Sequence, residues 1–234
     1  MTVDAFICQR VISSFCHFVN KIRTMDSSTF VINVGRQLGS GGHEVAEKLA
    51  QRLQIPFYDK ELIRIASEES GLCPEVFEKA DERASQSFLS HFWGMRFPFV
   101  GDSAVSATNC LSNDALFQVQ SDVIRKLASD QSALFVGRCA DYILRDHPRC
   151  VNLFISSSPS ERIKRLCQLH HVSETAAEEW IEKADDKRAS YYNYYTFKQW
   201  GAAASYHLCI DSSVLGIEGT VDFAEDFIRR KLSL

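Results

Sequence analysis

Four glycines lie close together near the start of the sequence, in a setting that suits phosphate binding: Gly35, Gly39, Gly41 and Gly42. They follow an apolar run at residues 30–34 that predicts a buried strand. They precede apolar residues at helical spacing between positions 45 and 53. Glycine lets the backbone turn its N–H groups toward a phosphate, and a helix N-terminus adds partial positive charge. The sequence therefore predicts a phosphate site formed by Gly39, Ser40, Gly41 and Gly42.

This loop lacks the lysine that phosphate-binding loops usually carry. The usual motif ends in Gly-Lys-Ser/Thr, where the lysine contacts the terminal phosphates and the hydroxyl contacts Mg²⁺. Gly42 and His43 hold those two positions here. Arg36 is the nearest cation within the loop, and a guanidinium can bind two phosphate oxygens at once. We expect Arg36 to supply the charge and His43 to donate to the ligand, with an exposed turn residue as the alternative for each.

Two more charged residues stand at the ends of expected strands. Asp59 follows the short strand Phe57-Tyr58, and Arg138 follows Gly137 after an apolar run at residues 133–136. Ligands of open α/β sheets collect at the carboxyl ends of the strands. The Asp59 carboxylate suits Mg²⁺ or its bound waters, whereas its alternative role is to cap the following helix. For Arg138 the alternative to ligand binding is a surface salt bridge.

A third group of charges lies in the second half of the chain. Arg162 and Arg165 are three residues apart, so one helix face carries both. Together with Arg188 they are expected to grip the transferred phosphate, and Asp185 is expected to orient them. Phosphoryl transfer depends mainly on positioning and charge neutralisation, which suits such a cluster. The candidate catalytic residues are Arg36, Asp59, Arg162, Asp185 and Arg188, and His43 and Arg165 join the loop as candidate phosphate-binding residues.

Composition and charge limit the kind of protein that this sequence encodes. The chain has 234 residues, of which 45% are hydrophobic and 24% are charged, as in a soluble globular domain. A net charge of -4 argues against a nucleic-acid partner. Eight cysteines without a CxxC pair indicate free thiols in a reducing cytoplasm. Because no apolar segment is long enough to span a bilayer, we expect a cytoplasmic protein without a membrane partner.

The order of the expected elements predicts an α/β fold. Apolar strands at residues 30–34, 57–58, 133–136, 151–155 and 207–213 alternate with helical patterns. This alternation is typical of a parallel sheet with helices on both faces. Two segments depart from the pattern, namely an irregular insert at about 72–113 and an aromatic-rich stretch at about 184–204. Long segments of this kind are often lids or binding loops.

Residues 1–24 are expected to lie outside the domain. They mix apolar and basic residues without the hydrophobic core and cleavage site of a signal peptide. Met25 leads directly into the first expected strand. We interpret residues 1–24 as a mis-assigned start or a disordered extension, and residues 25–234 as a single domain.

Six segments, taken in order, resemble the P-loop nucleoside monophosphate kinases, and most closely the cytidylate kinase-like family. They are GSGGHEVAEKLAQRL, FYD, VGRCADYIL, NLFISSSPSERIKRL, DDKRA and IDSSVLGIE, within residues 29–232. The pieces GRQLGSGG and YYNYYT resemble a divergent branch whose loop has no lysine. The resemblance implies a P-loop fold with a lid at about 184–204 and an insert at about 72–113 that binds the phosphoryl acceptor.

The same resemblance implies Mg²⁺-dependent transfer of a phosphoryl group from ATP to a nucleoside monophosphate, with CMP or dCMP first. It assigns the acceptor phosphate to Arg138, and it makes the glycine loop, with His43 and Arg165, the expected ATP-binding site. Cys139 replaces an aspartate that faces the acceptor sugar in true cytidylate kinases, so a kinase for another small acceptor stays open. A catalytically idle nucleotide-binding module is the other alternative, because the loop lysine is missing. Three roles stay open for the aromatic run at residues 191–200: packing in the core, stacking on a base, or contact between subunits of a homo-oligomer.

Overall fold

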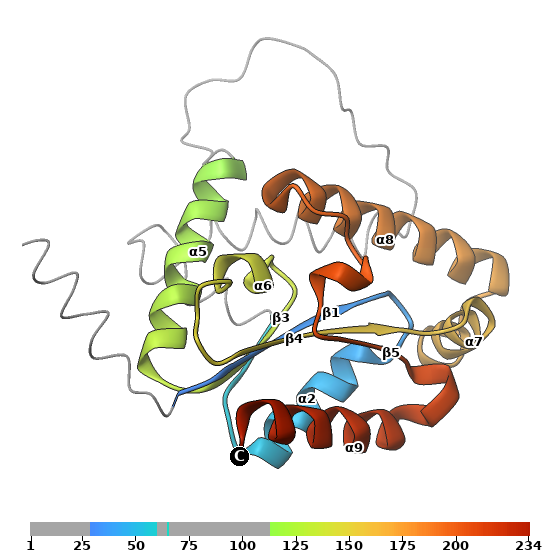
Figure 1. The fold of residues 1–234 in the computed structure, drawn as a ribbon. Helices are drawn as coiled ribbons and strands as arrows, with labels where there is room; N and C mark the ends of the chain where they lie inside the picture. The colour runs from blue at the N-terminus through green and yellow to red at the C-terminus, as the bar shows by residue number, and fades with distance from the viewer. Residues whose placement is uncertain (1–28, 60–64, 66–112) are drawn as a thin grey trace, which may run out of the picture.

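The computed structural model describes residues 29–59, residue 65 and residues 113–234 (Figure 1). The expectations for residues 1–24, for most of the helix that follows Asp59 and for the insert up to residue 112 lie outside these residues. The described chain forms a five-stranded sheet in the order β2-β3-β1-β4-β5. Every neighbouring pair of strands is parallel: β1 Val31–Arg36, β2 Phe57–Tyr58, β3 Ala133–Val136, β4 Cys150–Ser156 and β5 Leu208–Asp211.

Helices cover both faces of this sheet, which confirms the α/β fold predicted from the sequence. Helices α2 (Gly42–Leu53) and α9 (Ser212–Leu232) lie on one face. Helices α5 (Asn113–Asp130), α6 (Ala140–Ile143) and α8 (Glu174–Thr196) lie on the other, and α7 (Pro159–His170) stands beyond one end of the strands (Figure 1). A short 3₁₀ turn, η1 (Ala203–Ser205), precedes β5.

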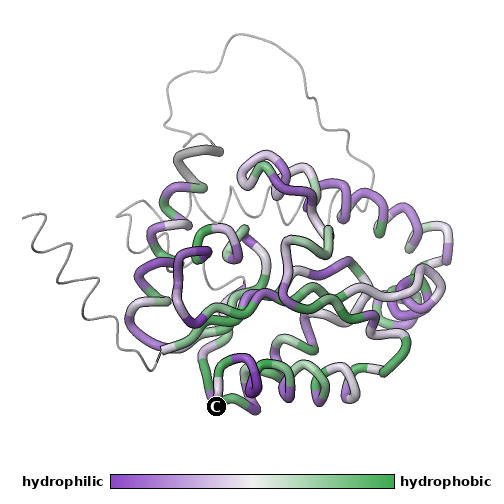
Figure 2. The backbone as a smooth tube through the Cα atoms, viewed as in Figure 1, coloured by the Kyte–Doolittle hydropathy of each residue, from purple (hydrophilic) through white to green (hydrophobic). Residues whose placement is uncertain are grey.

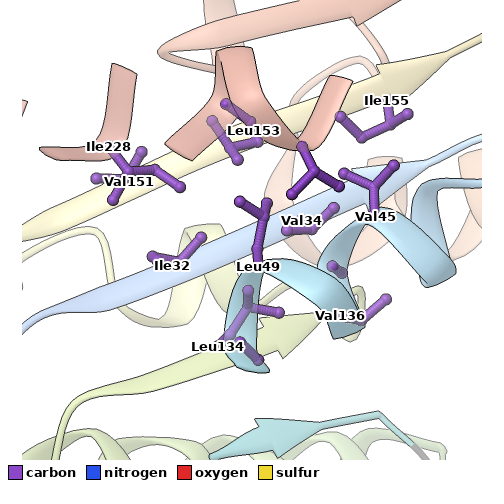
Figure 3. Packing of buried hydrophobic residues seen from close by; sticks show 14 of the residues in the cluster. Ile32, Val34, Val45, Leu49, Leu134, Val136, Val151, Leu153, Ile155 and Ile228 are labelled. Atoms are coloured by element: carbon purple, nitrogen blue, oxygen red, sulfur yellow. The ribbon is translucent and has the colours of Figure 1, made fainter. Parts of the chain in front are cut away.

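The alternation of side chains along the strands builds a separate core on each face. Ile32 and Val34 of β1 pack with Leu49 of α2 and Ile228 of α9 on one face (Figure 3). Val31, which points the other way, joins residues of α5 and α6 on the opposite face. Figure 2 shows the central strands as a hydrophobic band between helices that are polar on their outer sides. Because both faces are covered, the carboxyl edge of the sheet is the natural place for a ligand.

Two elements differ from the sequence expectation in extent. The range 184–204, expected to form a lid, begins inside α8, since this helix continues without a break to Thr196. The last strand was expected over residues 207–213, but β5 ends at Asp211 and α9 begins at Ser212, with a non-helical residue, Gly216, at φ 66°. The Asp211 side chain accepts a hydrogen bond from the Ser213 N–H and caps this earlier start.

Candidate functional site

The glycine loop joins the end of β1 to the start of α2, and several of its N–H groups have no partner among the described residues. Gly39 and Gly41 have φ values of 77° and 72°, a backbone conformation that glycine adopts most easily. Within the described part of the chain, no acceptor pairs with the N–H groups of Gly39, Gly41, His43 and Glu44. Free N–H groups in a left-handed turn at a helix start form a concave anion site. This geometry suits a phosphate, as the sequence predicts.

Contacts from three other elements hold the loop in this shape. The Ser212 hydroxyl at the start of α9 donates to the Ser40 carbonyl oxygen at 2.6 Å. The Leu38 N–H donates to Asp185 Oδ1 at 2.8 Å, and Arg162 Nε donates to the Leu38 carbonyl oxygen at 2.7 Å. A Cβ at Gly39 would lie 2.8 Å from the backbone oxygen of Arg162, so the close approach of α7 to the loop requires glycine at position 39. The loop is therefore fixed before any ligand arrives.

Gly42 holds the position of the usual lysine, and the side chain of Arg36 blocks the space that a lysine side chain would need there. A Cβ at Gly42 would lie 2.5 Å from the Cβ of Arg36 and 3.0 Å from the Cβ of Ile155. The backbone of Gly42 lies outside the positive-φ region, so its conformation does not itself demand glycine. Glycine is required at position 42 because the side chain of Arg36 occupies the adjacent space.

From there the Arg36 guanidinium extends across the carboxyl edge of the sheet. Its Nη2 lies 3.5 Å from Asp59 Oδ1 at the end of β2, and a Cβ at Gly137, after β3, would collide with its Nη1. Burial, reinforced by the neighbouring charge of Arg188, lowers the pKa of Arg36 to about 10, against the opposing effect of Asp59. Arg36 is therefore still a cation at neutral pH, and it lies over the strands where a phosphate would bind.

Asp59 joins this site through two basic side chains. His43 Nδ1 lies 3.1 Å from Asp59 Oδ2, and Arg36 approaches the other carboxylate oxygen. Burial by itself raises the pKa of Asp59, but the hydrogen bond from His43 and the charge of Arg36 outweigh it and lower that pKa. Asp59 is therefore an anion at neutral pH, and His43, which replaces the usual hydroxyl, holds it at the loop.

The site fits a magnesium ion that arrives with phosphates better than a metal held by protein alone. Among the described residues there is no group of three or more His, Cys, Asp or Glu side chains arranged around a metal position. Magnesium is usually bound through one or two carboxylates together with substrate phosphates and waters. The Asp59 carboxylate beside the glycine loop meets that requirement.

Asp185 brings two of the predicted arginines together. Its carboxylate accepts hydrogen bonds from Arg162 of α7 and from Arg188 Nη1, the latter at 3.3 Å. Arg188 Nη1 also lies 3.3 Å from the carbonyl oxygen of Arg36, its acceptor on β1. Arg162 is buried, and its guanidinium is hydrogen-bonded to the Leu38 carbonyl oxygen and to Asp185. Arg188, in contrast, lines the pocket described below. Asp185 thus links α7, α8 and the loop into one unit.

Arg165 lies apart from this cluster, although it shares a helix with Arg162. It forms an ion pair with Glu44 of α2. Its guanidinium carbon would lie 3.4 Å from a Cβ at Gly41, so it borders the loop on the side of α2. The structure therefore joins Arg162 and Arg188 through Asp185, but it places Arg165 on the other side of the loop, outside the single guanidinium cluster expected from the sequence.

Arg138 sits on a strained turn at the end of β3. Gly137, Arg138 and Cys139 have consecutive positive φ values of 74°, 56° and 56°. A left-handed conformation costs an ordinary residue roughly 1–2 kcal/mol, and such strain concentrates at functional sites. The turn places Arg138 and Cys139 at the pocket beside β1. Burial, followed by the nearby Asp141, raises the pKa of Cys139 to about 12, so its thiol is not ionised at neutral pH.

A pocket opens between the carboxyl ends of β1 and β3 and the second half of α8. Three cations, Arg36, Arg138 and Arg188, line it together with polar, small and aromatic residues: Asn33, Val34, Gly35, Gly137, Cys139, Asp141, Tyr191, Tyr192, Trp200 and Tyr206. Sequence reasoning missed Asn33, because a single polar residue inside an apolar run carries little signal.

The aromatic run of α8 divides between pocket, core and surface. Tyr191 and Tyr192 line the pocket, and Tyr195 stacks on Phe117 of α5 with ring centroids 4.0 Å apart. Tyr194 and Phe197 are 65% and 91% exposed. Tyr192 donates a hydrogen bond from Oη to Asp141 Oδ2 at 2.7 Å, which gives Asp141 a structural partner.

A sequence profile of the cytidylate kinase-like family matches residues 31–214. The chain belongs to the cytidylate kinase-like family. The match begins at β1 and ends just after β5, so it includes the glycine loop, Arg138, Asp185 and Arg188. Membership supports a kinase-like phosphotransferase, as the resemblance in the sequence predicts.

Several solved structures are similar to this chain. An uncharacterized protein from Eubacterium ventriosum ATCC 27560 is 28% identical, covers 88% of this chain and 99% of its own, and has a TM-score of 0.61. Shikimate kinase from Bacteroides thetaiotaomicron is 12% identical, with coverage of 86% and 98% and a TM-score of 0.48. A gluconokinase from Sinorhizobium meliloti 1021 is 14% identical, with coverage of 87% and 94% and a TM-score of 0.46.

A comparison with curated proteins gives no match. None of the described helices has the length and the apolar character needed to span a bilayer.

Proposed function

We propose that this protein transfers a phosphoryl group from ATP to a nucleoside monophosphate, with CMP or dCMP as the preferred acceptor. The observation that carries the proposal is the place of Arg36. Its side chain occupies the space that a side chain at position 42, the usual lysine position, would need. Its guanidinium lies at the carboxyl edge of the sheet. A loop that had merely lost its lysine would not need a buried arginine in the adjacent space.

The two substrates occupy the two sides of Arg36. The ATP phosphates bind the free N–H groups of the loop, between Gly39 and Glu44, with Arg165 at the outer side. The acceptor enters the pocket beside β1, where Arg138 holds its phosphate. Arg36 lies between these regions, because its backbone belongs to the loop strand and its guanidinium reaches Gly137. It is therefore placed to contact the phosphoryl group in transit.

The remaining charged residues support the transfer by position and charge. Arg188 lines the pocket and neutralises charge that spreads over the phosphoryl oxygens in the transition state. Asp185 is a positioning residue, since it holds Arg188, Arg162 and the loop N–H of Leu38 together. Asp59, oriented by His43, would hold a magnesium ion that arrives with ATP, or the waters of that ion, and the ion would supply positive charge to the phosphates.

A coupled ADP-release assay tests this proposal. The purified chain is supplied with ATP and Mg²⁺ and with one acceptor at a time: CMP, dCMP, UMP, AMP, GMP, shikimate and gluconate. The expected result is ADP release that depends on CMP or dCMP. ADP release with shikimate or gluconate alone would instead make it a kinase for another small acceptor. Measurable ATP binding without turnover on any acceptor would identify a catalytically idle nucleotide-binding module.

A further inference from the structure

An ion pair between α2 and α7 lies directly beside the glycine loop. Glu44, the third residue of α2, accepts a hydrogen bond from Arg165 Nη2 of α7. The Arg165 guanidinium lies against the loop, since a Cβ at Gly41 would be 3.4 Å from its Cζ and 3.5 Å from its Nη1. The backbone N–H of Glu44 belongs to the anion site together with those of Gly41 and His43. A cation that borders this site is therefore bound to a carboxylate of the protein itself.

This ion pair is weak enough for a phosphate ligand to break. The side chains of Arg165 and Glu44 are 29% and 42% exposed, so water screens their attraction and the pair adds little to the stability of the fold. ATP carries three phosphate groups, which present more negative charge and more acceptor oxygens than one carboxylate. A guanidinium also binds phosphate oxygens in pairs. A triphosphate at the loop can therefore take Arg165 from Glu44.

Glu44 has a second cation within reach when Arg165 leaves. Lys48 follows one helical turn later, and its Nζ lies 3.9 Å from Glu44 Oε1. Lys48 also donates to Glu218 Oε1 of α9 at 2.6 Å, and Glu218 Oε2 accepts from Arg52 Nη2 at 3.2 Å. Figure 1 shows α2 and α9 side by side, which brings these charges together. Because Glu44 and Glu218 each have two cationic neighbours, either carboxylate can lose one of them and stay paired.

We propose that Glu44 holds Arg165 back from the phosphate site, and that Arg165 exchanges Glu44 for the phosphates when ATP binds. Glu44 then pairs with Lys48. Glu44 thereby lowers the affinity for ATP, because the ion pair that is lost offsets part of the new contact. The exchange rests on the proposed function, which places the ATP phosphates at the loop, and it adds a protein carboxylate that competes with them.

Calorimetric titration of the full chain with ATP and with inorganic tripolyphosphate tests the exchange. Glu44→Gln keeps the size of the side chain and removes its charge, so both ligands should bind about two- to fivefold more tightly than to the wild type. Arg165→Gln should weaken the binding of both ligands. Glu47→Gln is the matched control, because it removes the same charge from an exposed position on the same helix, and both affinities should stay unchanged.

The double variant Glu44→Gln/Arg165→Gln separates exchange from simple repulsion. If Glu44 only repels the ligand, Glu44→Gln should gain the same affinity with or without Arg165. The exchange predicts that the gain is lost without Arg165, because no guanidinium is left to release. An equal gain in both backgrounds, or no gain from Glu44→Gln in a folded protein, would overturn the exchange.

The two ligands distinguish failure of the exchange from failure of the proposed function. If CMP is phosphorylated but Glu44→Gln changes neither affinity, the proposed function stands and the exchange is wrong. If tripolyphosphate binding shows the expected gain and its dependence on Arg165, but no acceptor is phosphorylated, the exchange stands and the proposed function is wrong. If the wild-type protein binds neither ligand, both are wrong.

Discussion

The side chain of Arg36 fills the space that any side chain at position 42 would need, because a Cβ at Gly42 would lie 2.5 Å from the Cβ of Arg36. The loop can therefore carry its cation at position 36 or at position 42, but not at both. A phosphate-binding loop usually presents lysine from the start of the helix. Here the cation comes from the end of the preceding strand, and glycine at position 42 follows from that choice.

A residue exchange tests this mutual exclusion. Gly42→Lys alone is expected to destabilise the fold by about 1–3 kcal/mol through overpacking and to weaken ATP binding. Arg36→Gly alone removes the cation. The double variant Arg36→Gly/Gly42→Lys frees the space and restores a lysine, so it is expected to bind ATP better than either single variant. Thermal denaturation and ATP titration of the four proteins form a double-mutant cycle, and strict additivity would refute the exclusion.

Arg138 is expected to show a conflict between stability and ligand binding. Arg138→Gly removes the cost of its positive φ, so the free energy of unfolding should rise by about 1 kcal/mol while the acceptor binds more weakly. Arg138→Ala keeps the left-handed backbone and loses the same guanidinium. Both variants should lose acceptor affinity and keep ATP affinity. Equal unfolding temperatures for the glycine and alanine variants would argue against strain, and equal losses for both ligands would argue against the acceptor role.

Asp185 is expected to matter more for stability than an ordinary ion pair. Its loss in Asp185→Asn leaves the buried guanidinium of Arg162 without its counter-charge, and breaking a buried pair typically costs about 3–5 kcal/mol. The exposed pair of Lys183 and Glu179 on the same helix is the control, because such pairs contribute about 0.3–0.5 kcal/mol. Chemical denaturation measures both. A loss for Asp185→Asn no larger than for Lys183→Ala would contradict the linking role.

The lowered pKa of Asp59 predicts how the stability of the fold changes at acidic pH. Because its pKa in the folded state lies below the ordinary value of 3.8, ionised Asp59 stabilises the fold above that pH. This contribution disappears as the pH falls through the lower, folded-state pKa. Asp59→Asn should therefore unfold more easily than the wild type at pH 6, and the difference between the two unfolding temperatures should shrink as the pH falls below 3.8. A difference that stays constant from pH 6 to pH 3 would show that the Asp59 charge is not what stabilises the loop.

The sequence was sufficient to predict the parallel sheet and the ligand edge, for reasons visible in particular residues. Apolar runs such as Val31–Val34 and Ala133–Val136 are buried on both faces, and strands of this kind give a strong local signal. Gly39 and Gly41 mark the loop because their positive φ values need glycine. Asp59 comes directly after β2, and Arg138 comes two residues after the end of β3. Because the strands are parallel, both residues lie at the same edge of the sheet.

Other features depend on contacts between distant segments and carry no local signal. The requirement for glycine at position 42 comes from the Cβ of Arg36. The separation of Arg162 from Arg165 depends on Asp185 and Glu44, which belong to two different helices. The unpaired oxygen of Asn33 depends on Asn152 of the neighbouring strand. Pattern and spacing cannot supply such relations between side chains.

The most direct test of the central claim, that Arg36 supplies the cation of this loop, is ATP affinity and turnover in Arg36→Ala. The loss of one charge-assisted contact in a shielded site corresponds to about 1.5–3 kcal/mol. We predict that Arg36→Ala stays folded and binds or turns over ATP about ten- to a hundredfold less well, whereas Arg125→Ala, which changes an exposed arginine on α5, has no effect. Wild-type affinity and turnover in a folded Arg36→Ala protein would contradict the claim.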